Sequence, residues 1–141
     1  MVCFSKAAVQ TKIRELKIMN LPIPQVGDGG MLIKVDAVSI CGSDVHYFRN
    51  EPAFPAVLGH EICGTIVEMG KNAADTIHAF YGPLKIGDRI CVYPGVTCGK
   101  CSDCLTYGNG VYTMCRDTFA YGDFFQYQGE GSLPFTNHID E

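Results

Sequence analysis

Apolar and polar residues alternate along several short stretches of the chain, with the period of two that is typical of β-strands. Residues 31–40 alternate well, whereas residues 13–18 are irregular but still compatible with a strand. Residues 62–69 and 89–93 contain many side chains that favour strands. Prolines and glycines separate these segments. The pattern predicts a mainly β fold, a partly open β-barrel whose short strands are joined by long loops.

Two stretches favour helix or loop instead. Ser43 is a suitable helix cap, so a short helical turn is predicted over residues 43–48, on one wall of a cleft. Residues 72–81 are predicted to form a loop or one weak helix. The chain contains neither an internal repeat nor the glycine-rich G-x-G-x-x-G fingerprint of dinucleotide-binding domains. No dinucleotide site is therefore expected within it.

Length and charge narrow the class of protein. The 141 residues suit one domain with a real core. A net charge of −4 and the absence of a long apolar run argue against nucleic acid and membranes as partners. The N-terminus does not resemble a signal peptide, so a cytoplasmic location is expected. The eight cysteines are then predicted to be reduced thiols, available to bind metal, rather than a disulfide scaffold.

Three cysteines lie in one short loop, with two residues between each and the next: Cys98, Cys101 and Cys104. Such spacing lets the backbone turn around a cation, and Cys115 can complete a tetrahedral shell of four thiolates. A closed shell leaves no position for water, which predicts a structural zinc site. Disulfides or coincidence are the alternatives. An iron–sulfur cluster is a further one, although the gap of ten residues before Cys115 departs from ferredoxin spacing.

A second constellation lies upstream. Cys41 opens the stretch Cys-Gly-Ser-Asp-Val-His, and His60 and Glu61 follow further along the chain. A mixed shell of thiolate, imidazole and carboxylate with one open position is what a catalytic zinc site requires, because the metal can then take an alcohol or carbonyl oxygen. The alternative is a buried Cys41, a core His60 and a surface Glu61. The residue types alone leave both open.

Four ordered motifs resemble the zinc-dependent medium-chain dehydrogenase/reductase family, the zinc alcohol dehydrogenases. They are Cys41-Gly42-Ser43-Asp44, Gly59-His60-Glu61-x-x-Gly64-x-x-x-x-x-Gly70-x-x-Ala73, Lys85-Ile86-Gly87-Asp88-Arg89-Ile90 and the cysteine loop. The resemblance covers roughly residues 5 to 125, and residues 41–47 are most similar to the sorbitol and related polyol dehydrogenases. It implies that residues 1–141 form the GroES-like catalytic domain, with a structural-zinc lobe.

The resemblance also implies roles for the upstream residues. Cys41 and His60 would bind the catalytic zinc, and Glu61 would be either a direct ligand or a carboxylate that approaches the metal during ligand exchange. Asp44 would accept the other ring N–H of His60, so that the correct nitrogen faces the metal.

Proton transfer is assigned in the same way. Ser43 would take the proton from the alcohol, and His46 would pass it on through the cofactor ribose, so both residues would also contact the cofactor. Tyr47 and Phe48 would line the substrate cleft, although packing is the simpler role for Phe48.

The chain departs from the family pattern in several places. The loop at residues 48–55 is short, the segment at 72–83 is long, and the gap before Cys115 is longer than usual. The chain is expected to stop before the Rossmann domain that would hold NAD or NADP. The expected function is the zinc-binding half of an NAD(P)-dependent alcohol or polyol dehydrogenase, a homo-oligomer at full length. The alternative is a truncated, non-catalytic module stabilised by zinc, acting in structure or interaction.

Overall fold

The computed structural model describes residues 3–50, 55–77, 79–108, 112–116 and 119–120. None of the helices in these segments is long and apolar enough to cross a membrane. The elements, in chain order, are β1 (Phe4–Lys12), β2 (Glu15–Pro22), β3 (Met31–Ser39), α1 (Gly42–Arg49), β4 (Ala56–Val57), β5 (Glu61–Met69), α2 (Ala73–Thr76), β6 (Arg89–Val92), β7 (Gly95–Val96), α3 (Ser102–Tyr107), the 3₁₀ turn η1 (Tyr112–Met114) and β8 (Phe119–Ala120).

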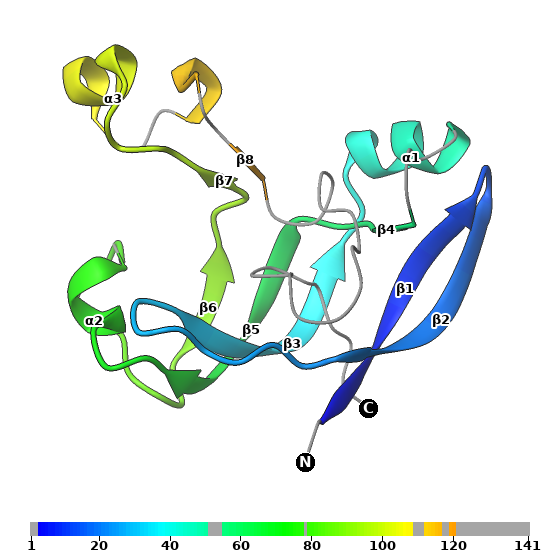
Figure 1. Cartoon of the computed structure of the whole chain (residues 1–141), viewed down its shortest axis with the longest axis horizontal. Helices are drawn as coiled ribbons and strands as arrows, with labels where there is room; N and C mark the ends of the chain where they lie inside the picture. The colour runs from blue at the N-terminus through cyan, green and yellow to red at the C-terminus, as the bar shows by residue number, and fades with distance from the viewer. Residues whose placement is uncertain (1–2, 51–54, 78, 109–111, 117–118, 121–141) are drawn as a thin grey trace.

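The described strands form three antiparallel sheets, ordered β2-β1-β4, β3-β5-β6 and β7-β8. Figure 1 shows β3, β5 and β6 side by side at the centre, with the β1–β2 hairpin to the right. The small β7–β8 pair and α3 lie above them, and α1 lies on the other side of the same upper region. The prediction of a mainly β fold with short helices and a separate lobe is confirmed.

The prediction was wrong at the N-terminus. Residues 13–18 were expected to form one strand, but Ile13 and Arg14 make the turn of a hairpin and β2 begins only at Glu15. The whole of β1 was missed. Its buried positions include the small Ala7 and the polar Gln10, so the large apolar residues that reveal a strand are scarce there.

The other strand predictions agree with the structure to within one residue at each end. Among the described residues of the range 72–81, which leave out residue 78, the single helical turn of α2 is the one regular element. Helix α1 is present, but Ser43 is not its cap as expected. Cys41 takes the N-cap position with extended backbone angles, and the Asp44 carboxylate accepts its N–H. The carboxylate of Asp44, the third residue of the helix, therefore fixes where α1 begins, rather than a hydroxyl at the N-cap.

The apolar core of the first sheet is a cluster of Ala7, Val9, Leu21 and Val57, each almost completely buried. These residues come from β1, β2 and β4, so their contacts join the hairpin to β4, the strand that directly precedes β5. In β5, Ile62 and Ile66 are buried on one face, as the alternation of a strand requires. Each fully buried aliphatic side chain of this kind contributes about 1.5 to 3 kcal/mol.

One cysteine pair corrects the expectation that all eight thiols are reduced. Cys63 and Cys91 form a disulfide between directly opposed positions of β5 and β6. Their Cα atoms lie 4.3 Å apart, a separation set by the pairing of the strands. The spacing of cysteines along a sequence does not show which of them face each other across a sheet. All eight cysteines lie in the described segments, and the other six are free of disulfides.

Gly64 is a point of close contact between the two long strands of the second sheet. A β-carbon at this buried position would meet the carbonyl oxygen of Lys34 and a methyl carbon of Ile33, both on β3. The neighbouring atom is backbone, which cannot move away as the end of a flexible side chain can. Glycine therefore permits the register in which β3 and β5 pair.

We expect Gly64→Ala to lower the free energy of unfolding by about 1 to 3 kcal/mol, because the added methyl group overpacks the contact with β3. Urea denaturation of the metal-loaded protein measures the change. Gly27→Ala is the matched control, because a β-carbon at Gly27 meets nothing within 4 Å. Equal stability losses in the two variants would show that the contact between β3 and β5 is not the cause.

Candidate metal centres

The register between β3 and β5 assembles the first centre. Ser39 at the end of β3 lies opposite Glu61 at the start of β5. Cys41 follows the end of β3 by two residues, and His60 immediately precedes β5. Because the strands run antiparallel, the two segments meet at one edge of the sheet. One ligand atom each from Cys41, His60 and Glu61 lie within 4.8 Å of one another.

Asp44 forms hydrogen bonds with both segments, the one that contains Cys41 and the one that contains His60. Asp44 is only 6% exposed, and its carboxylate accepts hydrogen bonds from the backbone N–H groups of Cys41, at 2.7 Å, and Gly59, at 3.0 Å. Gly59 has a φ of +99°, which glycine adopts without strain. The nearer Asp44 oxygen lies 3.8 Å from Nδ1 of His60, beyond hydrogen-bond range. The expected contact with the imidazole N–H therefore stays a prediction, and the demonstrated role of Asp44 is to position backbone.

The environment of Cys41 favours its thiolate. The hydroxyl and the backbone N–H of Ser43, followed by the imidazole of His60, lower the pKa of the Cys41 thiol below its ordinary value. The thiolate is the form that binds metals, so this site suits a divalent cation. Sequence analysis gave Ser43 roles as a helix cap, in proton transfer and in cofactor contact, and the structure adds hydrogen bonds to the Cys41 sulfur.

The far end of α1 is held by the β1–β2 hairpin. The amide of Gln10, which is fully buried, donates to the carbonyls of Tyr47 at 2.9 Å and Asn50 at 3.0 Å. The N–H of Arg14, at the hairpin turn, donates to the carbonyl of Phe48 at 2.8 Å. These bonds satisfy carbonyls that the end of a helix leaves without partners inside the helix. Sequence reasoning missed Gln10, because no motif marks it.

Ser43 and His46 stand three residues apart on α1, a spacing that places both side chains on one face of the helix. Ser43 is half-buried and His46 is exposed. The His46 ring contacts Tyr47 edge-on, with centroids 5.8 Å apart. Helix α1 thus presents a hydroxyl near Cys41 and an imidazole nearer to solvent.

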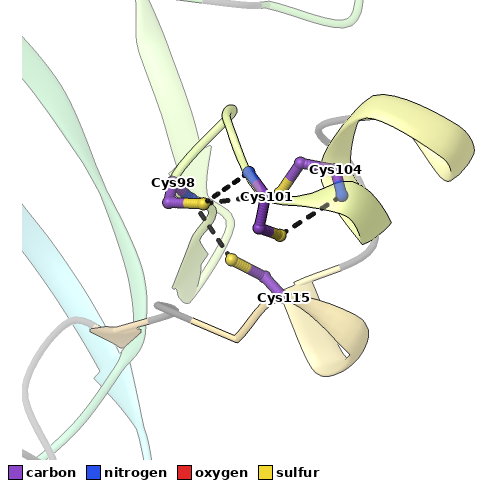
Figure 2. A group of neighbouring side chains, drawn as sticks. All are labelled: Cys98, Cys101, Cys104 and Cys115. Atoms are coloured by element: carbon purple, nitrogen blue, oxygen red, sulfur yellow. Dashed lines mark hydrogen bonds between the residues drawn. The ribbon is translucent and has the colours of Figure 1, made fainter.

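The second centre is the lobe that contains the four cysteines (Figure 2). Cys98 follows β7, Cys101 caps α3, Cys104 lies within α3 and Cys115 follows η1. The backbone N–H of Cys98 donates to the Cys115 sulfur, that of Cys101 to the Cys98 sulfur, and that of Cys104 to the Cys101 sulfur, at 3.3 to 3.4 Å.

The spacing of the sulfur atoms fits a single tetrahedral ion. The sulfurs of Cys98 and Cys104 are 3.9 Å apart, and all four lie within 4.8 Å of one another. Tetrahedral zinc with Zn–S bonds of about 2.3 Å requires sulfurs about 3.8 Å apart. Gly99 has a φ of +69°, which lets the loop between the first two cysteines turn tightly. The four sulfurs are therefore grouped closely enough for one zinc ion to bind among them.

The four thiols of the lobe lie within 4.8 Å of one another, so the charge on each affects the others. Backbone N–H groups of Arg116 and Cys104 lower the pKa of Cys101, whereas burial raises the pKa of Cys104 above its ordinary value. Four thiolates in so small a volume repel one another, so they cannot all ionise unless a positive charge lies among them. A divalent ion with thiolate preference supplies that charge.

The comparison with known families now identifies the class of protein. The alcohol dehydrogenase GroES-like domain matches residues 27–132. This chain belongs to the zinc-type alcohol dehydrogenases of the medium-chain dehydrogenase/reductase family, and the GroES-like fold implied by its motifs is confirmed.

Three relatives define the likeness further. Sorbitol dehydrogenase from Bacillus subtilis is 42% identical over 118 residues, which are 79% of this chain and 30% of the relative. An oxidoreductase/dehydrogenase of unknown specificity from Escherichia coli has a TM-score of 0.70 and 33% identity, covering 93% of this chain and 36% of its own. A structure described as a short chain alcohol dehydrogenase from Escherichia coli CFT073, solved with NADH, has a TM-score of 0.68 and 29% identity, covering 84% of this chain and 32% of its own. The chain thus spans about a third of the length of these relatives.

We expect purified, reduced protein to contain between one and two zinc ions per chain. The thiolate lobe should bind tightly, whereas the centre at Cys41 has fewer protein ligands and should lose part of its metal during purification. Elemental analysis gives the stoichiometry. Protein without zinc, or with a brown iron chromophore, would overturn the assignment of the lobe.

Substitutions should separate the two centres. Cys101→Ser should destabilise the domain severely, because metal binding to such loops contributes on the order of 10 kcal/mol to the local folded state. Cys41→Ser should mainly reduce metal binding at the first centre and leave the melting temperature close to that of the parent. Calorimetry and zinc content on the same samples test this, and equal melting losses in both variants would contradict the division of roles.

Proposed function

We propose that this chain is the zinc-binding and substrate-binding half of an NAD(P)-dependent alcohol or polyol dehydrogenase. The observation that carries the proposal is the meeting of Cys41, His60 and Glu61 within 4.8 Å on a scaffold of the zinc-type alcohol dehydrogenases. Three unlike ligands leave a tetrahedral ion one position for substrate, whereas the four cysteines of the lobe leave none. The first centre is therefore catalytic and the second is structural.

Zinc at the first centre would supply Lewis-acid chemistry, polarising the oxygen of an alcohol or carbonyl substrate. Cys41 is prepared for this role by the groups that lower its thiol pKa. His60 is 9% exposed, so packing holds its ring in place. Asp44 keeps the segments of both ligands at a fixed separation through their backbone N–H groups. The chain itself therefore preorganises the metal ligands.

Ser43 and His46 would move the proton that alcohol oxidation releases. The Ser43 hydroxyl, beside the Cys41 sulfur, would accept it from the substrate, and the exposed His46, one helical turn further on, would transfer it towards solvent. The hydride would go to the nicotinamide ring of NAD or NADP held by a Rossmann domain joined to this one. The NADH complex of the Escherichia coli relative supports the cofactor class, and the identity to sorbitol dehydrogenase supports a polyol substrate.

We expect residues 1–141 alone not to oxidise alcohols with added NAD or NADP, and to gain activity when fused to the Rossmann domain of a close polyol dehydrogenase. Hydride transfer requires the reacting carbons to be held about 3 to 3.5 Å apart, and a dinucleotide-binding domain provides that positioning. The production of NADH with a panel of alcohols and polyols measures the difference. A folded, zinc-loaded fusion without activity would instead support a non-catalytic, zinc-stabilised module.

The same fusion tests the proton path. Ser43→Ala should lower kcat far more than it weakens cofactor binding, because the main task of the hydroxyl is proton transfer in the reaction and its contact with the cofactor is secondary. Turnover by residues 1–141 alone, or a Ser43→Ala fusion with unchanged kcat, would refute the mechanism.

A further inference from the structure

The three side chains of the first centre are held in different ways. His60 is fixed by burial, and the backbone of Cys41 is fixed by its bond to Asp44. Glu61 is exposed, and a long exposed carboxylate samples many rotamers unless something restrains it. The structure shows one restraint: the Ser39 hydroxyl donates a hydrogen bond to Oε2 of Glu61.

The register of the sheet explains this bond. Ser39 and Glu61 are opposed residues in the pairing of β3 with β5, so their side chains emerge beside each other at the edge where the ligands gather. Ser39 is the last residue of β3, and Cys41 follows two residues later in the short segment that joins β3 to α1. Ser39, which restrains the Glu61 carboxylate, is therefore close in the chain to Cys41, which carries the thiolate.

We propose that Ser39 is a positioning residue that makes Glu61 a direct, one-oxygen ligand of the metal at this centre. The inference rests on the proposed function, because it assumes that Cys41, His60 and Glu61 form the catalytic zinc site. The hydrogen bond occupies one carboxylate oxygen and leaves the other for the metal. It thereby disfavours binding through both oxygens and keeps a coordination position for substrate. Carboxylate ligands of metals are commonly held by such hydrogen bonds, and loss of the bond weakens metal binding.

Two substitutions test the role. Ser39→Ala removes the hydroxyl and should weaken metal affinity at this centre by about 10-fold or more. Ser39→Thr retains a hydroxyl at the same strand position and should restore affinity to near that of the parent. Each protein is first loaded with one zinc ion at the four-cysteine lobe, which also confirms that the fold is intact. Co²⁺ is then titrated into the first centre and followed by its visible absorption, with Cys41→Ser as the blank.

A double-mutant cycle identifies the route of the effect. If Ser39 acts through Glu61, then Ser39→Ala should have no further effect on Co²⁺ affinity in a Glu61→Ala background. Equal losses in both backgrounds would show that Ser39 acts through the strand and would overturn the inference. Unchanged affinity in Ser39→Ala alone would overturn it as well, while leaving the catalytic site assignment intact. If the unmodified chain binds no more Co²⁺ than Cys41→Ser does, the proposed function fails, and the inference fails with it.

Discussion

The pairing register of β3 with β5 is the constraint on which the rest of the structure depends. It sets Ser39 against Glu61 and so brings the segment after one strand to the segment before the other. A slip of one residue would turn every side chain of β5 to the opposite face of the sheet. The carboxylate of Asp44 supports this register by bonding to the segments next to both strands, at Cys41 and Gly59. The missing side chain of Gly64 permits it, because the two strands can then approach closely.

Sequence alone could predict the centre whose ligands are close together in the chain. The four cysteines of the lobe lie within residues 98–115. Their spacing therefore predicts a metal-binding loop without any knowledge of the fold. The residues Cys41, His60 and Glu61 were found through family motifs, because their residue types alone left a structural role equally open. The long strands of the second sheet were also predictable, because residues 31–40 alternate and residues 62–69 contain many side chains that favour strands.

Contacts between strands could not be predicted in this way. Gln10 bonds to the end of α1 and Ser39 bonds to Glu61, so the first contact depends on how the hairpin packs against the helix and the second on the register of the sheet. The same is true of Cys63 and Cys91, whose pairing needs two strands to be aligned. The first strand was missed because small and polar residues occupy its buried positions. Each failure concerns information that exists only once distant segments are packed together.

The disulfide between β5 and β6 has a consequence for how the domain tolerates change. The strand that begins at Glu61 is linked to the strand that leads towards the lobe, and the 28-residue separation between the two cysteines becomes a covalent ring. The helical turn α2 and the long segment that follows it lie inside this ring. The ring can change in length without altering the covalent path that runs through the disulfide. Lengthening a closed loop also costs little entropy. The long segment at residues 72–83 is thereby kept apart from the geometry of the proposed metal centres.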